Sequence, residues 1–170
     1  MWDKIRLFST EKKSWLLFSS FCLFLEMSAL FVQYFLKFEP CLICVQQRAL
    51  ILLLMIVSFA GMFFRKSKIS IFFILGLMGI IGKIFDLALN KTLLQMNPSV
   101  AGFCSIEKPF PNWLPMDKWF PAIFLNQGDC SATDIDILGM SLSENLMLIS
   151  IILFIILGMV VISKLKKVSN

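Results

Sequence analysis

Four long apolar stretches constrain this 170-residue chain more than any other feature of its sequence. They are residues 14–36, 41–64, 69–89 and 145–163. A bilayer core of roughly 30 Å requires about 20 helical residues per crossing, so each stretch can span a membrane. The composition points the same way, because 58% apolar and 16% charged residues are unlike an average soluble domain. We therefore predict an all-α membrane protein, a bundle of four transmembrane helices in one domain, 1–170.

Basic residues mark the side of the membrane on which each connection lies. Ten of them flank the stretches on one common side: Lys4, Arg6, Lys12, Lys13, Arg65, Lys66, Lys68, Lys164, Lys166 and Lys167. The positive-inside rule places this side, with both termini, in the cytoplasm. Segments 37–40 and 90–144 then lie on the exported side. Topology therefore explains the net charge of +5 better than nucleic-acid binding does.

A cleaved signal peptide is the alternative explanation of the N-terminus. The apolar run after Lys13 is too long for the hydrophobic part of such a signal, and no small-residue cleavage pattern follows it. We therefore expect the first stretch to be retained as a transmembrane helix.

Isolated charges interrupt three of the stretches. Glu26 lies in the first, and its default role is a buried carboxyl paired to a neighbouring helix. Lys83 and Asp86 lie in the third at positions i and i+3, where we expect them to pair with each other. Arg48 lies in the second stretch, close to two cysteines.

The long loop, 90–144, is acidic and rich in proline. Five of the six prolines fall in it and limit any helix there to one or two turns. Residues 113–124 mix aromatic and apolar side chains with few charges, which favours a short helix at the membrane interface. The alternative is that these aromatic residues form a small core under the loop. We predict a mostly irregular loop carrying a short interfacial helix.

Four of the five cysteines fall on the exported side, where disulfides persist. Cys41 and Cys44 stand where the second stretch begins, and Cys104 and Cys130 stand in the long loop. Cys22 lies inside the first stretch and is most simply a small buried hydrophobe.

A C-x-x-C motif such as Cys41–Cys44 has three common roles: a structural disulfide, half of a zinc site, or a redox pair. Zinc sites usually repeat the close spacing or add histidine, whereas Cys104 and Cys130 are far apart and the chain has no histidine. We therefore expect no metal. Structural disulfides are the stronger alternative, because exported loops are commonly cross-linked in this way.

The position of Cys44 favours the redox role. Pro40 should start a helix, so Cys44 falls in its first turn, where free backbone N–H groups and the helix dipole stabilise a thiolate. Arg48 follows at i+4 on the same face, and its positive charge can stabilise that thiolate further. An isolated Arg in a span usually marks a functional site. The alternative for Arg48 is contact with lipid phosphates.

Energetics require a final electron acceptor. Some exported dithiol proteins are strong oxidants, with a reduction potential of about −120 mV, whereas a thioredoxin-like C-x-x-C has about −270 mV. Oxidation of such a dithiol by such a C-x-x-C disulfide would be unfavourable by roughly 7 kcal/mol. These potentials belong to known proteins of the two kinds and do not follow from this sequence. A lipid-soluble two-electron acceptor at the membrane edge could drive the reaction, and Arg48 is placed to polarise a quinone oxygen beside Cys44.

The ordered set of motifs resembles the disulfide bond formation protein B (DsbB) family over nearly the whole chain. Its elements are Leu25-Glu26-Met27-Ser28-Ala29-Leu30, Pro40-Cys41-Leu42-Ile43-Cys44 with Arg48, Cys104, Phe110-Pro111, Trp113-Leu114-Pro115-Met116-Asp117-Lys118-Trp119 and Gly128-Asp129-Cys130. The resemblance implies a multi-pass enzyme of the bacterial inner membrane. Such an enzyme reoxidises DsbA, a thioredoxin-like periplasmic oxidase, and reduces ubiquinone or menaquinone.

The resemblance also implies a role for each residue of the site. Cys104 would form the mixed disulfide with DsbA and release Cys130. Exchange would then join Cys130 to Cys41, and Cys44 would act on the quinone with Arg48 beside it. Some family members carry a histidine at the outer end of the third helix that is thought to help bind quinone. This chain has Lys91 in that neighbourhood.

Two rival hypotheses remain at the level of sequence. The first is a non-catalytic membrane subunit whose exported loop is held by structural disulfides and whose acidic face binds a partner. The second is a bundle of the vitamin K epoxide reductase type, which is disfavoured because the C-x-x-C of that family resembles a late-span element. Here Cys41–Cys44 opens the second span.

Overall fold

The computed structural model describes residues 11–37, 39–65, 67, 69–96, 109–125, 128 and 141–169. The helices in these ranges are α2 (Lys12–Phe35), α3 (Leu42–Phe63), α4 (Ile69–Met96), α5 (Met116–Trp119), α6 (Pro121–Phe124) and α7 (Leu142–Ser169). Four of them, α2, α3, α4 and α7, are long and apolar enough to cross a membrane. This confirms the predicted all-helical fold with four candidate spans and short helices between them.

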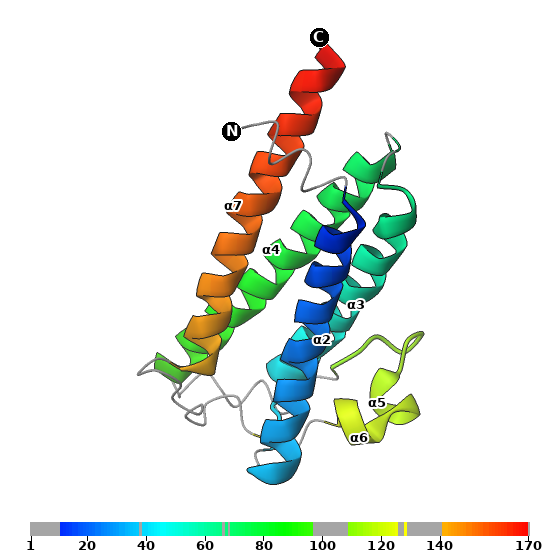
Figure 1. Cartoon of the computed structure of the whole chain (residues 1–170). Coiled ribbons are helices and arrows are strands. Elements are labelled where there is room, and N and C mark those ends of the chain that lie inside the picture. Colours follow the sequence, from blue (N-terminus) through cyan, green and yellow to red (C-terminus); the bar gives the residue numbers. More distant parts are fainter. Residues whose placement is uncertain are drawn as a thin grey trace.

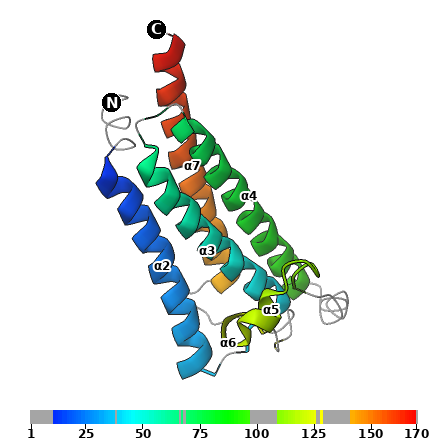
Figure 2. The same cartoon turned by 90° about the vertical axis from the view of Figure 1, so that its right-hand side faces the viewer.

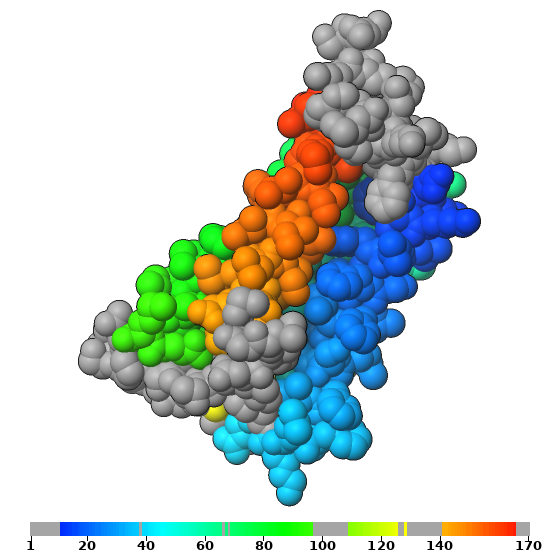
Figure 3. Space-filling view, turned by 60° about the vertical axis from the view of Figure 1, so that its left-hand side comes forward, coloured from blue at the N-terminus to red at the C-terminus, as the bar shows by residue number. Residues whose placement is uncertain are grey.

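The four long helices run side by side as one bundle (Figures 1 and 2). α4 packs against α7 and α3, and α3 also packs against α2. The start of α2 and the end of α7 lie at one end of the bundle, whereas α5 and α6 lie at the other, beside the end of α2 and the start of α3. In the space-filling view α7 is seen between α4 and α2 (Figure 3).

Buried apolar side chains from all four long helices form the core of the bundle. They are Trp15, Cys22, Ile51, Leu54, Met62, Ile74, Leu77, Ile81, Ile84 and Val160. Cys22 lies in this cluster, as a small hydrophobe would. Many large apolar residues on the outer faces of the helices are exposed, as a lipid-facing surface requires. Lys83 and Asp86 form the expected pair, with Nζ 2.7 Å from Oδ2, on the surface of α4.

Close contact between α2 and α3 depends on the absence of a side chain at Gly61. A Cβ at that position would collide with the ring of Trp15. One turn earlier, Ser58 Oγ donates a hydrogen bond to the Trp15 carbonyl oxygen over 3.2 Å. The two helices are therefore in close contact at the end of the bundle away from α5 and α6.

Two helices, α4 and α7, extend several residues beyond the apolar stretches that predicted them. α4 runs to Met96, past the expected end at residue 89, because no Gly or Pro interrupts residues 90–96 and a helix need not end where lipid ends. α7 begins at Leu142, where Ser141 and Glu144 form a capping box: Ser141 N–H donates to Oε2 of Glu144 at 2.8 Å, and Glu144 N–H donates to Oγ of Ser141 at 3.2 Å.

Candidate functional site

The cysteine pair lies at the N-terminus of α3. Cys41 is the N-cap residue, and its Sγ accepts a hydrogen bond from the backbone N–H of Cys44 over 3.4 Å. The two sulfur atoms are 3.0 Å apart, at hydrogen-bond distance from each other. A disulfide bond is about 2.05 Å long, so a shift of roughly 1 Å would close this pair. The C-x-x-C geometry is therefore compatible with both the dithiol and the disulfide.

Lys91 of α4 contacts the second sulfur of this pair. Its Nζ donates a hydrogen bond to Cys44 Sγ over 3.1 Å, and the side chain is 2% exposed. The extension of α4 beyond residue 89 makes this contact possible. Ile84, Ala88 and Lys91 are all buried and follow the spacing of one helix face. That spacing is the signal in the sequence that could have identified Lys91 as a neighbour of the site.

Arg48 lies one turn deeper in α3 and points toward α2 and α6. Its Nη1 donates to Gln33 Oε1 and, over 3.2 Å, to the carbonyl oxygen of Ile123, while Nη2 donates to the carbonyl oxygen of Ala29 over 3.0 Å. Arg48 also interacts electrostatically with Cys44. Its hydrogen bonds thus reach helices on one side of α3, whereas Cys44 is contacted from α4 on the other.

Glu26 is a buried acid that interacts electrostatically with Arg48. The carboxyl is 4% exposed, and neither of its oxygens has a hydrogen-bond partner among the described residues. It interacts electrostatically with Arg48 of the neighbouring helix. The expectation was a buried carboxyl paired to a neighbouring helix; the carboxyl is buried, and its described link to α3 is electrostatic rather than a hydrogen bond.

Three donors from α2 and α3 bind the end of α6. Tyr34 Oη donates to the Ala122 carbonyl oxygen over 2.7 Å, Gln33 Nε2 donates to the same oxygen over 3.4 Å, and Arg48 donates to that of Ile123. Carbonyl groups at a helix end lack intrahelical partners, so these donors satisfy them. Segment 109–125 is thereby docked against the end of α2 and the start of α3.

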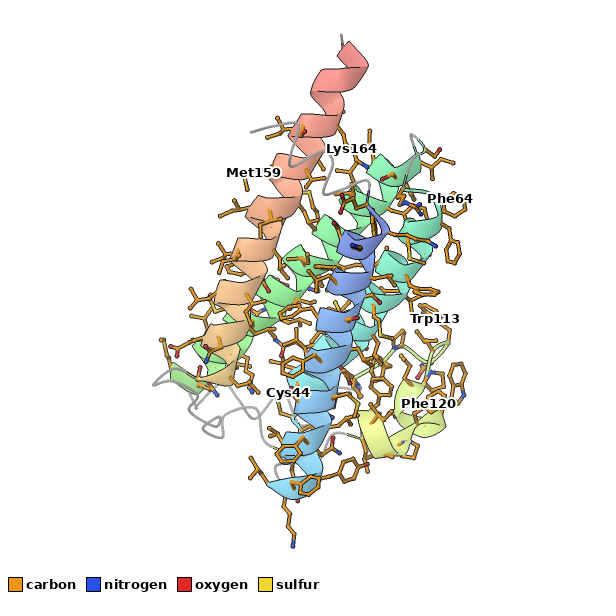
Figure 4. All side chains as sticks on the ribbon, viewed as in Figure 1. Cys44, Phe64, Trp113, Phe120, Met159 and Lys164 are labelled. Atoms are coloured by element: carbon orange, nitrogen blue, oxygen red, sulfur yellow. The ribbon has the colours of Figure 1, made fainter. Side chains whose placement is uncertain are left out.

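The aromatic side chains of this segment divide into two groups. Phe124 is buried and meets the ring of Phe110 edge to face, with ring centroids 5.6 Å apart. Trp113, Trp119 and Phe120 are exposed, and Figure 4 shows Trp113 and Phe120 on the side of α5 and α6 away from the bundle. The first group forms a small core under the segment, and the second leaves aromatic rings at the surface.

One further loop residue lies against the start of α3. Gly128 N–H donates to the Pro40 carbonyl oxygen over 3.1 Å, and Gly128 pairs with Cys41 in an isolated β-bridge. A Cβ on Gly128 would collide with the carbonyl oxygen of Glu39, so this approach requires glycine. The sequence interpretation did not assign Gly128 a role. Cys104 and Cys130 lie outside the described residues.

The described part of the site lies at the end of the bundle that carries α5 and α6. Cys44 is seen near that end in Figure 4, whereas Phe64 and Lys164 mark the opposite end. The structure brings Cys41, Cys44 and Lys91 into direct contact. It links Arg48 to the same site through electrostatics rather than through a hydrogen bond with either sulfur among those described.

Comparison with known proteins identifies the family. The family model of the disulfide bond formation protein DsbB matches residues 11–160. A disulfide bond formation protein B from Aeromonas salmonicida is 33% identical over 98% of this chain and 97% of its own length. The corresponding protein from Yersinia enterocolitica is 33% identical over 80% of this chain and 77% of its own, and one from Shewanella is 31% identical over 88% and 89%. The chain therefore belongs to the DsbB family of quinone-dependent disulfide oxidoreductases, whose members reoxidise DsbA and pass the electrons to quinone.

Proposed function

We propose that this chain oxidises a DsbA-like periplasmic dithiol protein at Cys104 and Cys130 and delivers the electrons through Cys41 and Cys44 to ubiquinone or menaquinone. The observation that carries the proposal is the cysteine pair at the N-terminus of α3, whose sulfur atoms are 3.0 Å apart and of which one, Cys44 Sγ, accepts a hydrogen bond from Lys91. A purely structural disulfide has no need of a buried cation at one sulfur.

The contact of Gly128 with the start of α3 supports transfer between the two cysteine pairs. Gly128 lies beside Pro40 and Cys41, and Cys130 follows it by two positions in the sequence. Two residues of extended chain span about 7 Å at most. Covalent connection therefore keeps Cys130 within reach of Cys41 when Gly128 is docked.

Thiol–disulfide exchange then proceeds by in-line thiolate attack. A substrate thiolate attacks Cys104 in the Cys104–Cys130 disulfide, and the electron pair of the broken bond leaves on Cys130. Cys130 attacks Cys41 in the Cys41–Cys44 disulfide, which releases Cys44 as a thiolate. The second substrate thiol displaces Cys104, which in turn attacks Cys130 and releases Cys41. The substrate now holds a disulfide, and Cys41 and Cys44 hold its two electrons.

The donors at this end of the bundle fit a quinone. A bound quinone would supply the terminal acceptor, taking two electrons and two protons as the Cys41–Cys44 disulfide forms again. Quinone oxygens accept hydrogen bonds, and Arg48 has five N–H donors, of which the three hydrogen bonds described above occupy three. We propose that Arg48 holds a quinone oxygen with a remaining donor.

The distribution of basic residues supports an orientation with both termini in the cytoplasm. Lys12, Arg65 and Lys164 lie at the starts or ends of helices at the same end of the bundle, opposite α5 and α6. The positive-inside rule assigns that end to the cytoplasm. The cysteines of α3 and the docked loop then face the periplasm.

Reconstitution into lipid nanodiscs tests the proposed function. A reduced DsbA-like protein should be oxidised rapidly when ubiquinone or menaquinone is included, and the quinone should be reduced in equal amount. Cys22→Ala, which changes a core cysteine away from both pairs, serves as the control and should retain activity. Oxidation that continues at the same rate after quinone extraction would sink the proposal. Resistance of both pairs to the substrate would favour structural disulfides instead.

A further inference from the structure

The inner cysteines differ in the groups that contact their sulfur atoms. Cys41 Sγ accepts the backbone N–H of Cys44, a neutral donor. Cys44 Sγ accepts the ammonium group of Lys91 over 3.1 Å. The contact is preorganised, because Lys91 is 2% exposed and projects from the buried face of α4 that also carries Ile84 and Ala88.

A buried ammonium group requires a compensating partner. Removal of a charge from water is costly unless an opposite charge or strong acceptors lie close by, and electrostatic attraction is stronger in such a medium than in water. A thiolate at Cys44 supplies an anion at hydrogen-bond distance from Lys91. A thiolate at Cys41 would accept the backbone N–H of Cys44, a neutral donor that stabilises an anion less than an ammonium group does, while Arg48 interacts electrostatically with both sulfur atoms.

This asymmetry determines which sulfur is attacked when the inner disulfide is opened. Attack at Cys41 forms a bond between the incoming sulfur and Cys41, breaks the Cys41–Cys44 bond and places the electron pair on Cys44. Attack at Cys44 would place it on Cys41. Exchange is faster when the leaving thiolate is better stabilised. The cation at Cys44 therefore makes Cys44 the better leaving group.

We propose that Lys91 is the counter-ion of the Cys44 thiolate and thereby directs incoming thiolates to Cys41. The proposal deepens the function proposed above, since it names the residue that gives the relay its direction. It differs from a role in holding quinone, because the contact is with the sulfur and operates in protein that contains no quinone.

The experiment uses the full-length chain with Cys104→Ser and Cys130→Ser, which retains the inner disulfide as the target. Quinone-free protein in nanodiscs is mixed with glutathione, and the released thiol is trapped by rapid alkylation. Fragmentation of the peptide that contains both cysteines then shows which one carries glutathione and which one is alkylated. We expect glutathione on Cys41 and the alkyl group on Cys44.

Removal of the charge should weaken the bias toward attack at Cys41. Lys91→Met should lower the ratio of attack at Cys41 to attack at Cys44 about tenfold, the equivalent of about 1.4 kcal/mol. In the reduced protein it should also shift the appearance of the Cys44 thiolate absorbance in the ultraviolet to higher pH. Lys91→Arg keeps the charge and should restore both signals. Lys83→Met, on the exposed face of the same helix, is the matched control and should change neither.

An unchanged ratio in Lys91→Met would overturn the proposal. So would an equal loss in Lys91→Arg, because that result would mean that packing rather than charge sets the bias. If Lys91→Met fails to fold, Lys91→Gln gives the same comparison with a neutral donor of similar shape. The assay needs neither quinone nor a DsbA-like protein. A failed nanodisc oxidation assay with an intact bias would therefore reject the proposed function and leave this inference standing.

Discussion

At the cysteine end of the bundle, the two sides of α3 each carry a buried cationic side chain, and the two cations contact different kinds of group. On the α2 and α6 side, Arg48 binds three oxygen atoms and thereby joins the docked loop to the bundle. On the α4 side, Lys91 contacts the sulfur of Cys44. A buried charge near a redox pair can therefore stabilise the packing of the loop as well as act on the chemistry of the sulfur atoms. Substitutions on each side should separate the two.

The largest effect on activity should come from substitution of Cys44, whose sulfur lies between the Arg48 side and the Lys91 side of α3. Cys44→Ser removes the group that Lys91 contacts and should lower quinone-linked oxidation by several orders of magnitude, because the reacting nucleophile is lost. Steady-state reduction of quinone by a reduced DsbA-like protein measures this. Mixed-disulfide formation between that protein and Cys104 should persist in the variant. Quinone reduction at the rate of the unmodified chain would refute the assignment of Cys44.

Gly128 tests whether the docked loop must approach α3 closely. Gly128→Ala places a Cβ against the Glu39 carbonyl oxygen, so the chain must move away from Cys41. A misplacement of about 1 Å can cost roughly 100-fold in rate, and we expect a loss of about that size in single-turnover transfer to the inner pair. Gly158→Ala is the matched control, because a Cβ there meets no other group within 4 Å. Equal rates in the two variants would contradict the proposed transfer.

Arg48 should behave as an anchor of the loop as well as a donor. Arg48→Met removes its bonds to Ala29, Gln33 and Ile123, and hydrogen bonds of charged groups contribute about 1.5–3 kcal/mol each. Hydrogen–deuterium exchange in α6 should therefore accelerate about tenfold to 100-fold. Lys91→Met should leave exchange in α6 unchanged. The same acceleration in both variants would show that the two sides of α3 are not separate.

The smallest effect should follow the loss of one neutral hydrogen bond on the α6 side. Tyr34→Phe removes the 2.7 Å bond from Tyr34 Oη to the Ala122 carbonyl oxygen. Such a bond contributes about 1 kcal/mol, so exchange in α6 should accelerate about fivefold. Exchange at the start of α3 and the bias of attack between Cys41 and Cys44 should not change. A change in that bias would mean that the loop anchor also controls the sulfur pair.

Much of the fold followed from patterns that are local in the sequence. The apolar stretches predicted α2 and α3 to within two residues at each end, because bilayer thickness imposes a length on a helix. The end of α4 did not follow, because the apolar stretch ends at Leu89 whereas the helix continues to Met96. The start of α7 carries a capping box, Ser141 and Glu144, that the sequence contains but that hydropathy alone does not reveal.

For the site, α3 begins at Leu42, two residues after Pro40, with Cys41 as its N-cap residue. Local sequence was enough to predict that the cysteine pair stands at the start of this helix. It also placed Arg48 one turn from Cys44. The three-dimensional structure was needed to show that Lys91 contacts Cys44 and that Arg48 reaches α2 and α6. Residues 44 and 91 lie on different helices, and their contact depends on how α3 and α4 pack. Helix periodicity gives each residue a face, but the packing of the bundle decides what that face meets.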